Sequence, residues 1–254
     1  MSKDWVVYAC AVEGRPATVY LDMAIAEDAP LERLPVAAWV QLRMQQPRED
    51  GLSSDDELDV LKAIEEALVA GLTDKSTAYV GCITTNGRRD FHFYTAAAAG
   101  WKERVSSALR AFPTHAFTCA SRPDREWDIY FDRLSPSDED RERIQNRRIC
   151  DALQRSGERF AVARPIEHSA YFPSDAARAQ FVDRVTPMGC RVVEMLEPEE
   201  LGEQFGVRVA ALGIPSHAQI DALVLPLFHA ANECGGEYDG WETQVCGLGG
   251  NRSS

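Results

Sequence analysis

The side chains best suited to chemistry in this sequence are the neighbours Glu167 and His168 and the cluster of Tyr238, Asp239 and Trp241. A carboxylate beside an imidazole can orient the ring and raise its pKa. If the terminal strand lies beside the strand that carries His168, Asp239 could act in this way within a polar pocket that includes Tyr238. Such a pocket would be either a binding site or a pH-sensitive structural link.

The same residues also have structural interpretations. Neighbours on a strand point to opposite faces of a sheet, so Glu167 and His168 are not expected to act on one substrate. For His168 the favoured interpretation is packing at the sheet face near Tyr171 and Phe172. For the terminal aromatic residues it is anchoring of the last strand to the core, because buried aromatic side chains usually have a structural role. The alternative is a rigid contact surface for a partner.

Hydrophobic periodicity in the second half predicts the elements that position these residues. Helices are predicted over 137–157, 174–185 and 216–234. Strands are predicted over 161–172, 190–196 and 206–212, and a terminal strand begins at 237. Gly235 and Gly236 end the last helix, because glycine adopts a left-handed backbone without a Cβ penalty. Asp239-Gly240 is a turn dipeptide between the two aromatic residues. This order predicts a ferredoxin-like α/β sandwich.

The first half predicts an antiparallel sheet with helices packed on one face. Strands are expected over 4–12, 17–25, 36–44, 77–85, 89–96, 115–121 and 126–134, and helices over 54–71 and 98–111. Asn86-Gly87 is a strong hairpin signal. His92 alternates with phenylalanines and is predicted to face solvent or a strand edge. A break near Pro136 divides the chain into two α+β domains, 1–136 and 137–254.

Two groups of motifs carry a family resemblance. YDGWET (238–243) together with RPIEHSAYF (164–172) resembles the RraB family, the bacterial ribonuclease E inhibitor B proteins. This resemblance implies a ferredoxin-like fold, no catalytic role, and a ribonuclease E-type endoribonuclease as the protein partner. WVVYAC, GRRDFHFYT and WDIYFDRLSP resemble domain-of-unknown-function family 695 over about residues 4–136, which implies no particular activity.

Composition narrows the classes of partner and site. The net charge of −13 is shared by both halves, so the surface repels phosphate backbones and favours a basic protein over nucleic acid. Seven cysteines have no CxxC pair and no zinc-site spacing, which is typical of a reducing compartment. The start of the sequence does not resemble a signal peptide, and no apolar run is long enough to span a membrane. We therefore expect a cytoplasmic protein without a metal or cofactor.

These observations together predict a non-catalytic regulator that binds a protein partner, since no nucleophile or metalloprotease motif is present. The residues predicted to contact the partner are Tyr238, Asp239, Trp241, Glu242 and His168, with the acidic helix start 138–142 as a rim. One alternative is a small-molecule-binding or enzymatic protein with a site at the domain junction near His168 and Tyr238. Another is a homodimer formed by the pairing of exposed sheet edges.

Overall fold

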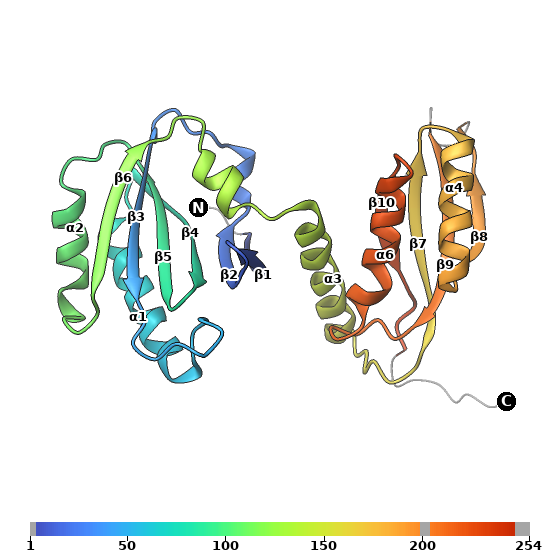
Figure 1. Ribbon diagram of the computed structural model, residues 1–254, viewed down its shortest axis with the longest axis horizontal. Coiled ribbons are helices and arrows are strands. Elements are labelled where there is room, and N and C mark those ends of the chain that lie inside the picture. Colours follow the sequence, from blue (N-terminus) through green and yellow to red (C-terminus); the bar gives the residue numbers. More distant parts are fainter. Residues whose placement is uncertain (1–3, 199–203, 247–254) are drawn as a thin grey trace. The chain divides into compact units, whose positions relative to one another are not determined.

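The computed structural model describes residues 4–198 and 204–246. The chain forms two compact units, residues 1–140 and 141–254, and each contains an antiparallel sheet with helices (Figure 1). The α+β class predicted from the sequence is therefore confirmed. The units divide inside helix α3 (Asp138–Arg155), shortly after the boundary that the sequence predicted.

The first unit is built on a six-stranded antiparallel sheet with the strand order β1-β2-β4-β5-β3-β6. The strands are β1 (Trp5–Val12), β2 (Arg15–Asp22), β3 (Val36–Arg43), β4 (Thr77–Thr85), β5 (Arg88–Thr95) and β6 (Phe117–Pro123). The predicted hairpin joins β4 to β5 through Asn86 and Gly87. Both turn residues have positive φ, at 50° and 74°, as a type I′ turn requires.

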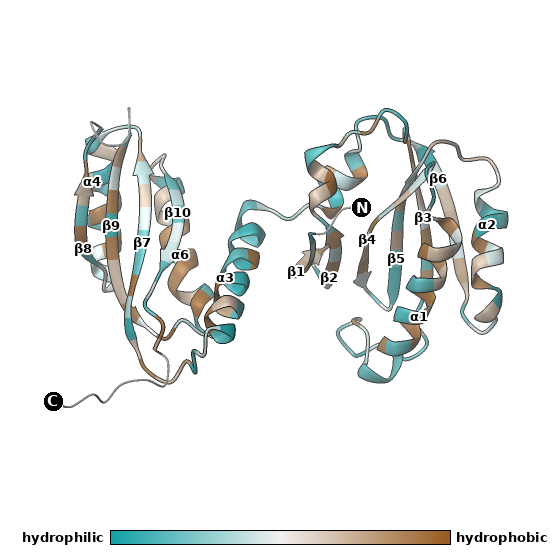
Figure 2. Cartoon of the chain, turned by 180° about the vertical axis from the view of Figure 1, so that it is seen from behind, coloured by the Kyte–Doolittle hydropathy of each residue, from teal (hydrophilic) through white to brown (hydrophobic). Residues whose placement is uncertain are grey.

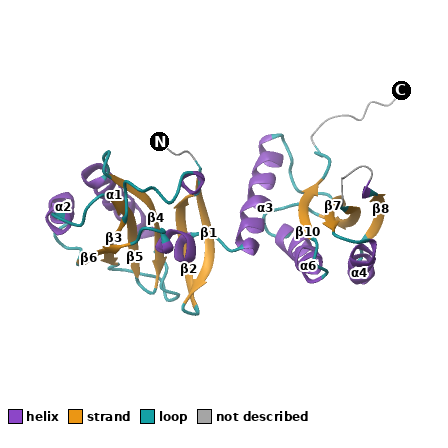
Figure 3. Ribbon diagram, turned by 90° about the horizontal axis from the view of Figure 1, so that it is seen from above, coloured by secondary structure: helices purple, strands orange, loops and turns teal. Residues whose placement is uncertain are grey.

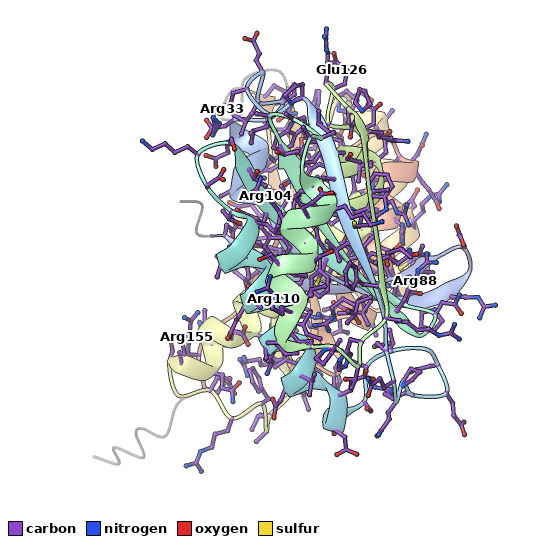
Figure 4. The ribbon with its side chains drawn as sticks, turned by 90° about the vertical axis from the view of Figure 1, so that its left-hand side faces the viewer. Arg33, Arg88, Arg104, Arg110, Glu126 and Arg155 are labelled. Atoms are coloured by element: carbon purple, nitrogen blue, oxygen red, sulfur yellow. The ribbon has the colours of Figure 1, made fainter. Side chains whose placement is uncertain are left out.

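Helices α1 (Asp55–Leu72) and α2 (Trp101–Ala108) cover one face of this sheet, where their apolar side chains pack on β3, β4 and β5. Arg104, which lies on α2 (Figure 4), contacts the end of α1 and the turn before β4. Its guanidinium donates to the carbonyl oxygen of Leu72 and lies 3.2 Å from the Asp74 carboxylate. This contact joins α2 to the segment that links α1 and β4, about 30 residues earlier in the sequence.

The opposite face of the sheet is covered in part by the π-helical segment η3 (Ile129–Leu134), and the prediction of a strand over 126–134 is wrong. The Asp124 carboxylate accepts two backbone N–H groups at the start of η3, at 3.0 and 3.1 Å, which favours a helical turn. Trp127 then stacks on Tyr94 with the ring centroids 3.8 Å apart. Local alternation of apolar residues does not reveal the capping by Asp124 or the stacking on Tyr94.

Two other expectations for the first unit also fail. His92 is only 4% exposed, because it lies on the same face of β5 as Tyr94, the face that η3 covers. Burial lowers the pKa of His92 to about 3, so its ring is neutral. The strand expected over 17–25 ends at Asp22, whose carboxylate accepts a backbone N–H of the 3-10 helix η1 (Ala24–Glu27).

The second unit has a ferredoxin-like arrangement, as predicted. After α3 its elements are β7 (Arg164–Phe172), α4 (Asp175–Val185), β8 (Arg191–Leu196), β9 (Phe205–Gly213), α6 (Ile220–Glu233) and β10 (Glu237–Glu242). The antiparallel sheet has the order β10-β7-β9-β8, which places the first strand next to the last one. Helices α4 and α6 lie on the same side of this sheet (Figure 3).

The core of the second unit lies between that sheet and its helices. Alternate residues of β7 and β9 face inward, and hydrophobic residues are prominent on β9, whereas α3 is mainly hydrophilic (Figure 2). Gly235, with a φ of 70°, follows the end of α6 as predicted. A Cβ atom at Gly236 would lie 2.2 Å from the ring of Phe172, so the chain passes too close to the core for any larger residue.

Candidate functional site

The predicted site residues lie on two paired strands, β7 and β10. The pairing places Trp241 opposite His168 and Tyr238 opposite Ala170, with a β-bulge between Tyr238 and Gly240. Residues three positions apart on a regular strand point to opposite faces of the sheet. The bulge inserts one extra residue between Tyr238 and Trp241, so these two side chains point to the same face of the sheet, into the core.

His168 and Tyr238 form a buried hydrogen-bonded pair. The Tyr238 hydroxyl lies 2.8 Å from His168 Nδ1, and the two residues are 1% and 6% exposed, respectively. Burial lowers the pKa of His168 to about 4, which keeps the imidazole neutral near pH 7. Because both groups lie within the core of the second unit, a small molecule cannot reach them. The alternative of a ligand site near His168 and Tyr238 therefore loses its structural basis.

The prediction that Asp239 orients the His168 imidazole and raises its pKa is wrong, both in the partner of the ring and in the direction of the pKa shift. Asp239 is exposed at the bulge, and the polar partner of the imidazole is the Tyr238 hydroxyl. The pKa of His168 falls because desolvation disfavours the charged ring, whereas a neighbouring carboxylate would have raised it. The pair therefore acts as a structural link.

Trp241 joins β10 to two helices through a chain of hydrogen bonds. Its indole Nε1 donates to Asn146 Oδ1 of α3 at 2.7 Å, and Asn146 Nδ2 donates to Asp221 Oδ1 of α6 at 2.9 Å. Arg143 also donates to Asp221, at 3.1 Å. These contacts support the anchoring interpretation of the terminal aromatic residues. The sequence analysis missed Asn146, although an asparagine at a buried position of a charged helix is a detectable signal.

Carboxylates with no cation in ion-pair distance among the described residues border these anchored residues. The pKa of Glu142 in α3 is raised, first by burial and second by the negative charge of the nearby Asp239. Glu142 Oε2 is buried without a hydrogen-bond partner among the described residues. We call Glu142 and Asp239, together with the exposed Glu237 and Glu242 of β10, the acidic edge.

The acidic edge differs from the other carboxylates on the outer face of this sheet. Glu167 and Glu194 lie 3.9 and 2.9 Å from the guanidinium of Arg208, which balances their charge. Within the described part of the chain, no cation lies within ion-pair distance of Asp239 or Glu142. An unbalanced cluster of this kind attracts cationic groups.

The residues after β10 are held to the start of β7 by a buried ion pair. Arg164 Nη2 lies 2.8 Å from Glu158 Oε2, and Arg164 Nε donates to the Thr243 hydroxyl at 3.1 Å. Burial acts to raise the pKa of Glu158, but the backbone N–H groups of Cys246 and Phe160, together with Arg164, outweigh it and lower the pKa. Arg164 is therefore paired with Glu158 and with Thr243.

Neither a metal-binding cluster nor a membrane-spanning helix occurs in the described part of the chain. No three His, Cys, Asp or Glu side chains from residues 4–198 and 204–246 gather closely enough to hold a metal ion. No helix within the same residues is long and apolar enough to cross a bilayer.

Two family models match the chain. Residues 3–135 match DUF695, a family of unknown function, and residues 143–243 match RraB, regulator of ribonuclease activity B. Both resemblances inferred from the motifs are thereby confirmed. No curated protein matches the chain.

Solved structures with some similarity were also found. An unknown protein from Galdieria sulphuraria is 14% identical with a TM-score of 0.22, and the match covers 82% of this chain and 99% of that one. A "putative glycine cleavage system transcriptional repressor" is 9% identical with a TM-score of 0.25, covering 82% and 98%, respectively.

Proposed function

This chain belongs to the DUF695 family through its first unit and carries an RraB domain in its second, and we propose that the second unit is a non-catalytic module that binds a ribonuclease and changes its activity. The family description names a regulator of ribonuclease activity. The buried, neutral His168 supports a role without catalysis, because it is hydrogen-bonded inside the core and cannot reach a substrate.

The acidic edge is the observation that carries the binding part of the proposal. Carboxylates that repel each other are stabilised when a cationic side chain approaches, and the raised pKa of Glu142 reflects burial and then that repulsion. The anchored Tyr238 and Trp241 hold β10 rigid, so Asp239 and Glu242 are presented with little loss of conformational entropy on binding. We propose that the two exposed acids contact the partner, while the buried residues position them.

By resemblance the partner is an endoribonuclease of the ribonuclease E type, acting with this chain in the cytoplasm. Enzymes that act on RNA need basic segments to bind phosphate groups. A basic segment docked on the acidic edge would be withdrawn from RNA, which gives a simple physical route to inhibition. Electrostatic complementarity of this kind mainly increases the association rate and the specificity of a complex.

Binding of a purified ribonuclease E-type enzyme to the full chain tests this proposal. A rim charge contributes up to about 1 kcal/mol, so Asp239→Asn should weaken binding about fivefold. Asp183→Asn is the matched control, because Asp183 is an exposed aspartate of α4 in the same unit, away from the acidic edge. Equal affinities for the two variants would refute the acidic edge as the contact.

A further inference from the structure

The first unit contains a groove of about 720 Å³ between α1 and the neighbouring face of β1, β2 and β4. Helices α1 and α2 pack mainly on the central strands, and Trp5 of β1 and Tyr20 of β2 pack only at the margin of that core. The groove is therefore lined by partly exposed aromatic side chains on the sheet and by one face of α1. Its volume is in the range of small-molecule sites in proteins.

Three aromatic side chains form one wall of this groove. The rings of Trp5 and Tyr20 have centroids 4.6 Å apart, and Trp5 stacks on Tyr79 at 5.4 Å. Trp5 and Tyr20 are half-buried, whereas Tyr79 is buried. Contiguous ring faces of this kind favour a flat, conjugated ligand, because stacking rewards planar contact.

Beside this wall lie the Glu65 carboxylate and the Arg89 guanidinium, which do not form a hydrogen bond with each other. Glu65 Oε1 accepts from the Tyr79 hydroxyl at 2.9 Å, and Arg89 Nε donates to the Thr84 hydroxyl at 2.8 Å. Arg89 Nη1 and Glu65 Oε2 are 3.8 Å apart, which is an ion pair but too long for a hydrogen bond. The Arg89 and Glu65 side chains are largely buried, at 10% and 16% exposed, and both line the groove. Neither Glu65 Oε2 nor Arg89 Nη1 is therefore fully satisfied by the other, and a ligand in the groove could bond to both.

The charges and the thiol of the groove further limit what it can hold. The groove is also lined by Lys62 and Glu66, which are exposed to solvent on α1. The more buried Glu65 and Arg89 balance each other, so a charged ligand would leave one of them uncompensated in a partly buried place. Cys82 also lines the groove, but burial raises its pKa to about 12, and the thiol therefore stays protonated. A neutral, non-covalently bound ligand fits this environment.

We propose that the groove binds a flat, neutral heterocycle with a cyclic amide edge, the chemistry of guanine and uracil, as a free base or nucleoside. The ring N–H would donate to Glu65 Oε2, and the adjacent carbonyl would accept from Arg89 Nη1. The ring itself would lie against Trp5 and Tyr20. A free base or nucleoside is favoured over a base within an RNA strand, because the protein carries a net charge of −13.

The test uses the full chain labelled with 5-fluorotryptophan and followed by ¹⁹F NMR, with the Trp5 signal assigned through Trp5→Phe. Guanosine and uridine are titrated, beside adenosine, which lacks the cyclic amide, and a short oligouridine. We expect guanosine or uridine to shift the Trp5 signal and adenosine to do so at least tenfold more weakly. Stronger binding of oligouridine than of uridine would identify RNA as the ligand and overturn the proposal.

Methylated nucleosides test the amide contact without altering the protein. N1-methylguanosine and N3-methyluridine lack the donating N–H and should bind about tenfold more weakly, because Glu65 would be left unpaired. Glu65→Gln should weaken binding while retaining a side chain of the same size. Equal binding of the methylated and parent nucleosides, or no response of Trp5 to either parent, would overturn the proposal, whether or not the variant folds.

Discussion

Acid should destabilise the second unit through His168. The pKa of this buried imidazole is about 4 in the folded protein, against an ordinary value of 6.5 when exposed. Between pH 6.5 and pH 4 the imidazole is protonated in the unfolded chain but neutral in the folded chain. The stability present above pH 6.5 is therefore lost as the pH falls toward 4. Linkage gives a loss of about 2 kcal/mol in the free energy of unfolding between about pH 7 and about pH 5.

Trp241 offers a direct readout of this loss, because it is the only tryptophan in residues 141–254. Urea unfolding of the fluorotryptophan-labelled chain, followed through its ¹⁹F signal, gives the free energy of unfolding of the second unit at each pH. His168→Gln removes the titrating group. The free energy of unfolding of this variant's second unit should therefore change less between about pH 7 and about pH 5 than that of the unaltered chain, whatever the variant's stability at pH 7. A variant with the same pH slope as the unaltered chain would refute the assignment of a buried neutral imidazole.

Three other perturbations follow from buried polar groups in the two units. Trp241→Phe removes the hydrogen bond to Asn146 and should lower the stability of the second unit by about 1–3 kcal/mol in urea unfolding, and the double variant with Asn146→Ala should lose less than the sum of the two single variants, because both remove that bond. Arg178→Met removes a buried guanidinium that donates to two backbone carbonyls and pairs with two carboxylates, so a loss of about 3 kcal/mol is expected in the same assay. His92→Leu removes a buried ring whose nitrogens have no hydrogen-bond partner among the described residues, so the first unit should lose stability less steeply below about pH 6 in thermal unfolding.

The sequence was sufficient for the elements whose signals are local. The Asn86-Gly87 hairpin and the glycine end of α6 depend on backbone preferences of the residues themselves. The ferredoxin-like order of the second unit could be predicted because helix and strand periods alternate clearly along residues 137–242.

Tertiary contacts account for what the sequence did not reveal. The η3 segment has strand-like alternation, but the carboxylate of Asp124 and the stacking of Trp127 on Tyr94 select a helical turn. The geometry around the predicted site residues could not be derived from the sequence, because a one-residue bulge decides which side chains of β10 face the core. The bulge buries Tyr238 with His168 and leaves Asp239 exposed, which reverses the predicted pairing.

The most direct test of the proposed function is the rate of RNA cleavage by a purified ribonuclease E-type enzyme in the presence of the full chain. The account predicts that the chain slows cleavage without cleaving RNA itself, and that the effect weakens at high salt, because it depends on the acidic edge. Asp239→Asn should slow cleavage less than Asp183→Asn does. An unchanged cleavage rate at saturating concentrations of the folded chain would contradict the central claim.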